Sequence, residues 1–123
     1  MIVGHGIDIV EVDRIAEKIN SEAFRQKVFS PNEIAFCEAK KNKAEHYAAR
    51  FAAKEAFLKA TGQGLLAGLN LNEIEIKTDE AGKPFLVLQG NFKSMATERN
   101  WNNLHVSLSH TRTLACASVI IEQ

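Results

Sequence analysis

The sequence predicts an α+β fold, a small antiparallel sheet with helices packed on one side, in a single domain over residues 1–123. Three observations support this prediction. Residues 2–10 are mainly apolar and β-branched, which is typical of a strand. Residues 45–60 form the longest helical pattern. The chain ends in two apolar segments joined by a short polar turn, which is the pattern of a β-hairpin.

Composition limits the kind of protein this can be. The 123 residues are 46% hydrophobic and 24% charged, which is typical of one globular domain and excludes bulk disorder. Lys plus Arg and Asp plus Glu each number 15, so the zero formal charge does not support nucleic acid or an anionic membrane as a partner. Two cysteines, Cys37 and Cys116, are too few for a disulfide framework. With no signal-peptide pattern, we expect a cytoplasmic protein.

The first third of the chain predicts two helices after the first strand. Asp13 is the expected cap of a short helix. Residues 30–33, Ser-Pro-Asn-Glu, combine serine at the cap, proline in the first turn and glutamate three residues after the serine, which is a capping box. We expect the helix that begins there to reach about Lys41 and to bury Ile34 and Cys37.

The long helix is expected over residues 45–60 and ends at Thr61 and Gly62, where glycine takes the usual capping position after a helix. The rest of the chain predicts two strands, a short helix, and the two strands of the closing hairpin, at residues 73–77, 84–88, from 91, 104–109 and 114–122.

A carboxylate interrupts the apolar stripe of the predicted long helix. Glu55 lies one turn beyond Phe51, within that stripe. A carboxylate on a core-facing stripe is costly unless something pairs with it. An ordinary helix pair with Lys59, four residues later, would account for it. The alternative is a metal ligand held on a rigid helix.

Asp8 interrupts the most apolar strand, between Ile7 and Ile9. An aspartate there caps, pairs or binds a cation, unless it is simply exposed at a sheet edge. Two carboxylates from different elements suit Mg²⁺, which takes one or two protein oxygens and leaves its other positions to water and substrate phosphates. A structural zinc site would require cysteine and histidine instead.

Basic residues and glycines gather around the predicted long helix, at Arg50, Lys54, Lys59, Gly62 and Gly64. Backbone N–H groups of a glycine-rich turn can approach a phosphate, and lysines add positive charge. A helix cap alone also explains Gly62. The phosphate loops of the Walker and dinucleotide-binding folds precede a helix, whereas this segment follows one, so both folds are disfavoured.

Polar residues mark the end of the predicted strand 104–109. His105, Ser107 and Ser109 share one face of it, and His110 begins the turn. Serine catalysis is disfavoured because adjacent strand residues point to opposite faces, and because a serine hydrolase also requires an acid and an oxyanion hole. A ligand contact at the strand end and a solvated sheet face both stay open.

In this order, the segments resemble the holo-[acyl-carrier-protein] synthase branch of the 4′-phosphopantetheinyl transferases, in its short form. The matching residues are 6–10 with Arg14, 28–30 with Glu33 and Cys37, 50–64, and 105–110. The resemblance spans the whole chain. Its most specific part is segment 50–64, Arg-Phe-Ala-Ala-Lys-Glu-Ala-Phe-Leu-Lys-Ala-Thr-Gly-Gln-Gly.

The resemblance implies the 4′-phosphopantetheinyl transferase fold. It also implies transfer of 4′-phosphopantetheine from coenzyme A to a serine of apo acyl carrier protein, with release of adenosine 3′,5′-bisphosphate. It makes Asp8 and Glu55 ligands of Mg²⁺ and places Lys59 at the diphosphate, so these three are the expected catalytic residues. The residues expected around coenzyme A and its 3′-phosphate are Arg50, Lys54, Gly62, Gly64, Ser109 and His110. Short family members are homotrimers with active sites between subunits.

The carrier protein is acidic, so the resemblance implies a basic docking surface early in the chain. The candidates for this surface are Arg14, Lys18 and Arg25.

The implied chemistry fits elementary requirements. Phosphoryl transfer needs mainly positioning and charge neutralisation, which a bridging Mg²⁺ and a lysine provide. The general base stays open between Glu55 and a metal-held water. A Mg²⁺-dependent hydrolase of nucleotides or diphosphates, and a non-catalytic module that binds coenzyme A or a carrier protein, are the alternatives. The two carboxylates, together with segment 54–64, argue against both.

Overall fold

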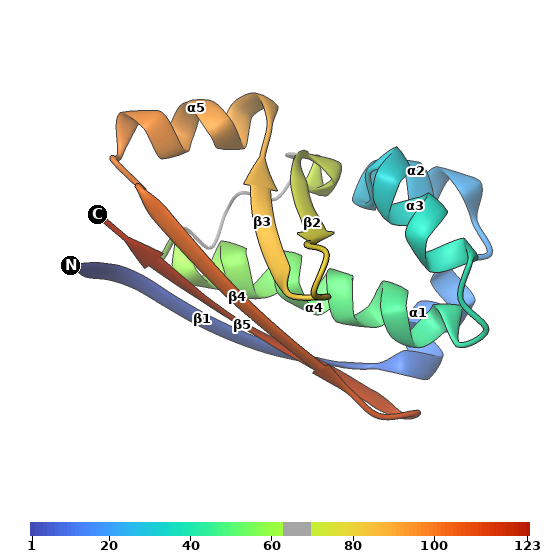
Figure 1. Ribbon diagram of the computed structural model, residues 1–123. Coiled ribbons are helices and arrows are strands. Elements are labelled where there is room, and N and C mark those ends of the chain that lie inside the picture. The colour runs from blue at the N-terminus through green and yellow to red at the C-terminus, as the bar shows by residue number, and fades with distance from the viewer. Residues whose placement is uncertain (63–69) are drawn as a thin grey trace.

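A long helix, α4, lies across one face of a three-stranded sheet, and a two-stranded sheet packs beside it (Figure 1). The computed structural model describes residues 1–62 and 70–123. Its elements in chain order are β1 (Ile2–Glu11), α1 (Val12–Lys18), α2 (Glu22–Val28), α3 (Pro31–Glu38), α4 (Lys43–Ala60), the 3₁₀ turn η1 (Leu71–Glu73), β2 (Ile74–Thr78), β3 (Pro84–Leu88), α5 (Gly90–Glu98), β4 (Asn103–His110) and β5 (Leu114–Glu122). None of the described helices is both long and apolar enough to cross a membrane.

The three-stranded sheet has the order β1-β5-β4 and is antiparallel throughout. Its inner face packs on α4 through alternate residues of β5, such as Ala117 and Val119. Its outer face carries no helix and leaves Ile7 and Ile9 of β1 each 63% exposed. The second sheet pairs β2 with β3. The α+β class is confirmed, with the strands divided between two sheets rather than gathered in one.

Glycines allow α4 to approach β1 closely. A Cβ atom on Gly6 would lie 2.0 Å from the carbonyl oxygen of Ala56, and one on Gly4 would lie 2.2 Å from that of Ala60. Real atoms do not approach so closely, so only glycine fits at these two strand positions. The close contact fixes the face of α4 that lies against the middle of β1.

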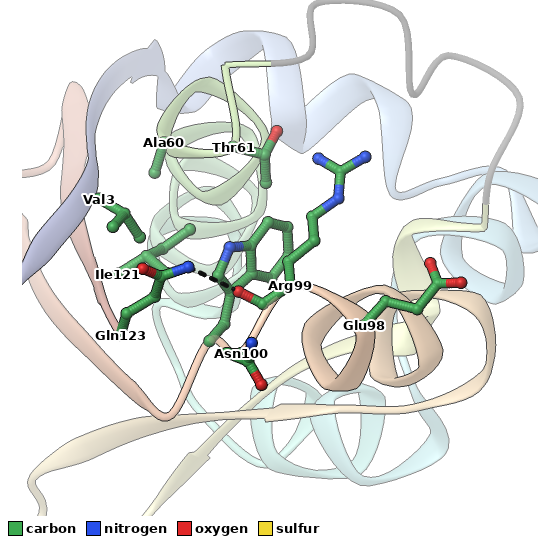
Figure 2. Close-up of a pocket in the computed structure, with 9 residues that line it drawn as sticks. Val3, Ala60, Thr61, Glu98, Arg99, Asn100, Ile121 and Gln123 are labelled. Atoms are coloured by element: carbon green, nitrogen blue, oxygen red, sulfur yellow. Dashed lines mark hydrogen bonds between the residues drawn. The ribbon is translucent and has the colours of Figure 1, made fainter.

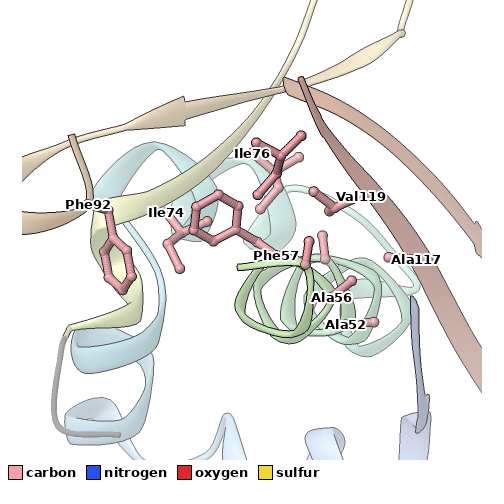
Figure 3. Close-up of a cluster of buried hydrophobic side chains, with 11 residues drawn as sticks. Ala52, Ala56, Phe57, Ile74, Ile76, Phe92, Ala117 and Val119 are labelled. Atoms are coloured by element: carbon pink, nitrogen blue, oxygen red, sulfur yellow. The ribbon is translucent and has the colours of Figure 1, made fainter. Parts of the chain in front are cut away.

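Two hydrophobic clusters form the core, and α4 contributes to both. In the first, Phe57 packs edge-on against Phe92, with a centroid distance of 5.9 Å (Figure 3). Phe57 also packs edge-on against Trp101, again with a centroid distance of 5.9 Å. In the second, the ring centroids of Phe29 and Tyr47 lie 4.8 Å apart. The buried faces of α4 therefore connect the three-stranded sheet with β2 on one side and with the short helices on the other.

The short helices confirm one sequence expectation and differ from others. The capping box is confirmed, because Ser30 Oγ accepts from the N–H of Glu33 at 3.2 Å while Glu33 Oε1 accepts from the N–H of Ser30 at 2.9 Å. Helix α3 nevertheless ends at Glu38, earlier than expected. Asp13 lies in the first turn of α1 and is not its cap. The sequence analysis missed α2, whose cap is Ser21.

Candidate active site

Three of the predicted site residues meet where α4 crosses β1. Lys59 Nζ lies 3.0 Å from Asp8 Oδ1 and donates a hydrogen bond to the carbonyl of Ile7 at 3.1 Å. Glu55 lies one helical turn before Lys59. The Asp8 side chain is 15% exposed and that of Lys59 is 57% exposed, so the cluster opens to solvent on the lysine side. The ion pair of Lys59 with Asp8 thus joins two elements, and an ordinary pair within the helix does not account for the arrangement.

The carboxylate of Asp8 acts on the carboxylate of Glu55. Burial and then the negative charge of Asp8 raise the pKa of Glu55, and Lys59 only partly opposes this. Two acids beside one lysine leave excess negative charge, which a divalent cation would neutralise. Among the described residues no group of three or more His, Cys, Asp or Glu side chains is placed to hold a metal. The two carboxylates of Asp8 and Glu55 suit Mg²⁺, which accepts one or two protein oxygens and takes its other ligands from water and phosphates.

Arg50 lies on another side of α4, beneath helix α3. Its residue is only 3% exposed, and its guanidinium carbon lies 4.1 Å from the centroid of the Phe36 ring. Within the described part of the chain, the buried Nε of Arg50 has no hydrogen-bond partner. Arg50 and Lys77 also line a pocket of about 270 Å³. A buried cation with an unused donor beside a pocket is suited to an anionic ligand.

The end of β4 lies against the start of α4. His110 Nδ1 hydrogen bonds with Glu45 Oε1 at 2.9 Å. Ser109, just before it, is exposed on the outer face of the sheet. Sequence analysis did not find Glu45, because an acid in the first turn of a helix is ordinary and gives no functional signal.

Lys54 does not lie in a ligand site. Its Nζ is 2.7 Å from Glu33 Oε1 and also donates to the carbonyls of Leu71, at 3.0 Å, and Ile74. These three acceptors use all three hydrogens of the ammonium group. Both charged side chains are 0% exposed, and burial lowers the pKa of Lys54 although Glu33 opposes this. The expected contact between Lys54 and coenzyme A is therefore wrong, because its donors are already used inside the protein.

The predicted glycines lie just after α4. Gly62 has a φ of 70°, the left-handed conformation of a glycine that ends a helix. A Cβ there would meet no atom within 4 Å, so the space around it is open. Gly64 lies outside the described residues.

The predicted docking residues lie on the first two helices. Arg14 and Lys18 are exposed on α1. Arg25 on α2 instead donates a hydrogen bond to the carbonyl of Ile19, the residue that caps the end of α1. Arg14 and Lys18 are available on the surface, whereas Arg25 also holds the two helices together.

A separate pocket of about 360 Å³ lies at the C-terminal end of α4 (Figure 2). Val3, Ala60 and Ile121 form an apolar wall, and Gln123 Nε2 donates to the carbonyl of Arg99 at 3.0 Å on another side. The catalytic candidates Asp8, Glu55 and Lys59 do not line it. The candidate active site is therefore the cluster between β1 and α4.

Comparisons with known proteins show the family to which this chain belongs. Residues 4–117 match the 4′-phosphopantetheinyl transferase superfamily. The holo-[acyl-carrier-protein] synthase of Syntrophus aciditrophicus is 47% identical over 125 residues, which cover 99% of this chain and 97% of that protein. The crystal structure of the Neisseria meningitidis synthase has a TM-score of 0.89 and 31% identity, with full coverage of both chains. The Bacillus anthracis synthase, solved in complex with CoA (3′,5′-ADP), has a TM-score of 0.81 and 34% identity, covering 98% of this chain and 96% of that one.

The fold and the site thus define a phosphopantetheinyl transferase, and the chain belongs to the 4′-phosphopantetheinyl transferase superfamily. Within it, the curated relatives that match over almost the whole length are holo-[acyl-carrier-protein] synthases. The expectation of an enzyme of this class, and of its fold, is confirmed.

Proposed function

We propose that this enzyme transfers 4′-phosphopantetheine from coenzyme A to a serine of apo acyl carrier protein in the cytoplasm, with Mg²⁺, and releases adenosine 3′,5′-bisphosphate. The observation that carries the proposal is the cluster of Asp8, Glu55 and Lys59 in a chain of this family. The complex of the Bacillus anthracis synthase with CoA (3′,5′-ADP) supports the co-substrate.

The reacting groups are arranged around that cluster. The serine hydroxyl of the carrier protein forms a new bond to the phosphorus that bears pantetheine, and the bond from this phosphorus to the adenosine bisphosphate breaks. Mg²⁺ held by Asp8 and Glu55 would supply neutralisation of the diphosphate charge. Lys59, fixed by its ion pair with Asp8, adds positive charge beside the breaking bond. The serine proton passes to the Glu55 carboxylate or to a water next to it.

Residues outside the cluster serve the two substrates. Arg50, Gly62, Gly64, Ser109 and His110 surround coenzyme A. The unused donor of buried Arg50 supports a phosphate in this part of the site. The exposed Arg14 and Lys18, with Arg25 beside them, receive the acidic carrier protein.

The enzyme works as a homotrimer with its active sites between subunits. The outer face of the three-stranded sheet supports this assembly, because Ile7 and Ile9 are largely exposed there and exposed apolar patches mark protein contacts. Asp8 lies between them on this edge strand, with its side chain on the opposite face toward Lys59 of α4, so a neighbouring chain on the outer face would lie across the strand from the metal cluster.

Incubation of the enzyme with coenzyme A, Mg²⁺ and apo carrier protein, followed by mass spectrometry of the carrier, tests the function. Wild type should add one phosphopantetheine group. Asp8→Asn and Glu55→Gln should each lose at least about 100-fold in turnover, since each removes a charge that the transition state requires. Glu80→Gln, in an exposed turn, is the matched control and should retain full turnover.

Two outcomes would overturn parts of the proposal. Consumption of coenzyme A without modification of the carrier would indicate a hydrolase. Near-normal turnover of Asp8→Asn or Glu55→Gln at saturating Mg²⁺ would remove the metal assignment.

A further inference from the structure

The buried side of α4 consists mainly of alanine. Six of its ten buried residues are alanines, namely Ala48, Ala49, Ala52, Ala53, Ala56 and Ala60. A helix is held at one rotation when projecting side chains interlock with its neighbours, and a methyl group projects too little to do this well. The close approach at Gly4 and Gly6 sets the distance between α4 and β1. Small rotations of α4 about its own axis need a further, directional restraint.

Lys54 provides such a restraint on the opposite side of α4. It precedes Ala56, which faces β1, by two positions, and this turns the two side chains about 200° apart around the helix. The Lys54 ammonium donates to Glu33 Oε1 on α3, to the carbonyl of Leu71 in η1 and to the carbonyl of Ile74 in β2. Hydrogen bonds weaken steeply when they bend away from a straight geometry. Three bonds from one nitrogen to three separate elements therefore hold α4 at one rotation.

The carboxylate that accepts from Lys54 cannot follow the lysine if α4 turns. Glu33 Oε1 also accepts from the N–H of Ser30 at 2.9 Å, and Glu33 Oε2 accepts from the N–H of Ile76 at 3.0 Å. The carboxylate is thus fixed to the backbone at the start of α3 and in β2. Both charged side chains are 0% exposed, and separation of the pair would leave a buried charge without its partner.

Glu55 is the next residue along α4, so the rotation of the helix determines where its carboxylate lies. Consecutive helical residues point about 100° apart, and Glu55 is turned to where the charge of Asp8 acts on it. A carboxylate about 6 Å from the helix axis moves about 1 Å for each 10° of rotation. Because Mg²⁺ requires short bonds in a nearly octahedral arrangement, a shift of this size weakens or breaks such a bond.

We propose that the buried Lys54–Glu33 pair positions Glu55 to bind the metal ion, so that Lys54 and Glu33 are positioning residues for the transfer reaction. Both act through the rotation of α4, because the donors of Lys54 are already used inside the protein. The inference rests on the proposed function, which makes Glu55 a ligand of Mg²⁺. It gives Lys54 a role in metal binding through Glu55, in place of the coenzyme A contact that the sequence resemblance implied.

Two variants perturb the pair in different ways. Lys54→Met with Glu33→Gln removes both charges together and leaves no unpaired buried charge. Glu33→Asp retains both charges and shortens the carboxylate side chain by one methylene, so Lys54 must shift to keep its bond. Val28→Ala is the matched control, because Val28 is buried in α2 and its truncation lowers stability without changing either charged residue. Circular dichroism gives a temperature at which wild type and all three variants are folded.

Three measurements at that temperature test the proposal. Electron paramagnetic resonance gives the affinity for Mn²⁺ with coenzyme A present, titration calorimetry gives the affinity for coenzyme A without metal, and steady-state kinetics give kcat and KM. The double variant should lose about tenfold in Mn²⁺ affinity and at least about tenfold in kcat. Its affinity for coenzyme A without metal and its KM for the carrier protein should change less than about twofold. Glu33→Asp should lose about threefold in Mn²⁺ affinity and in kcat, and Val28→Ala should lose neither.

The outcomes distinguish this inference from the function on which it rests. Unchanged Mn²⁺ affinity in the folded double variant or in folded Glu33→Asp would overturn the positioning role. Equal losses in Val28→Ala would assign the pair to the fold alone, and a tenfold fall in coenzyme A affinity without metal would make Lys54 a coenzyme A ligand. Either result overturns the inference. Failure of wild type to modify the carrier protein, with Mn²⁺ affinity still reduced in both variants of the pair, would overturn the proposed function and retain the positioning of Glu55.

Discussion

Glu55 holds a carboxylate in a half-buried position beside the carboxylate of Asp8. Both conditions raise its pKa in the folded chain. The folded chain therefore binds a proton at Glu55 more tightly than the unfolded chain does. The free energy of unfolding then falls as the pH rises from the ordinary pKa of Glu55 through its raised value. At neutral pH the ionised Glu55 destabilises the metal-free protein, which is the expected cost of a site prepared for a cation.

Glu55→Gln should accordingly raise the melting temperature of the metal-free protein at pH 7. It should give little gain at pH 4, where Glu55 is mostly protonated in both the folded and the unfolded chain. Differential scanning calorimetry at the two pH values measures this, with the exposed Glu80→Gln as the control that should change neither. An equal gain at both pH values would show that packing, and not charge, is responsible.

Single residues also show which features of the candidate site can be predicted from the sequence and which cannot. Asp8 and Glu55 were found because each interrupts an apolar pattern, and such an interruption is visible in a sequence. Lys54 was misassigned because its partner, Glu33, is 21 residues away in the chain and no periodicity connects them. The contact between His46 and His110 was missed for the same reason, since 64 positions separate them and only the fold brings them together.

Among the elements, the contact between β1 and α4 matters most for the candidate site. Gly6→Ala would place a Cβ 2.0 Å from the backbone of α4, so the helix must move away from the strand and Lys59 away from Asp8. We expect a loss of at least about 2 kcal/mol in the free energy of unfolding. Gly62→Ala is the matched control, because its Cβ meets no atom and only the left-handed backbone costs about 1 kcal/mol. Urea denaturation compares them, and equal losses would contradict the argument.

A buried ion pair between Lys54 and Glu33 joins α4 to α3, and Lys54 also donates to the carbonyls of Leu71 in η1 and Ile74 at the start of β2. Lys54→Met would leave Glu33 as an unpaired buried charge and should destabilise the protein by about 3–5 kcal/mol. Lys54→Met with Glu33→Gln removes both charges and should recover at least about 1 kcal/mol of that loss, although Ser30 and Ile76 each lose part of an acceptor. Chemical denaturation of both variants measures this. A double variant less stable than the single one would mean that Glu33 acts mainly through its backbone contacts.

The elements that sequence analysis found are those with a local signal. The capping box at Ser30, the strand at 84–88 and the closing strand at 114–122 depend on neighbouring residues, and all three are confirmed. Helix α2 has only seven residues, too few for a clear helical period. The division of the strands into two sheets was not predicted, because which strands pair depends on contacts between distant segments.

At the scale of the whole molecule, the proposed site has two parts: the cluster of Asp8, Glu55 and Lys59, and the region around Arg50. These two parts lie on different sides of α4. Glu55 and Lys59 face Asp8 on β1, whereas Arg50 lies under Phe36 of α3. Five helical positions separate Arg50 from Glu55, which turns their side chains about 140° apart. We therefore expect one coenzyme A molecule to reach both parts where two chains meet. The exposed Ile7 and Ile9 on the outer sheet face support a contact of this kind.

Mixed assemblies test whether the active site joins two chains. Chains with Glu55→Gln retain the Arg50 part, and chains with His110→Ala retain the Asp8–Glu55 part, so each homotrimer should be inactive. In trimers reassembled at random from equal amounts, a quarter of the interfaces combine two intact parts, so activity should return to about a quarter of wild type. Sedimentation confirms that mixed trimers have formed, and mixing Glu55→Gln with Asp8→Asn is the control, because both changes lie in one part and no interface is complete. A mixture of Glu55→Gln and His110→Ala chains that forms trimers and stays inactive would place the complete site within a single chain.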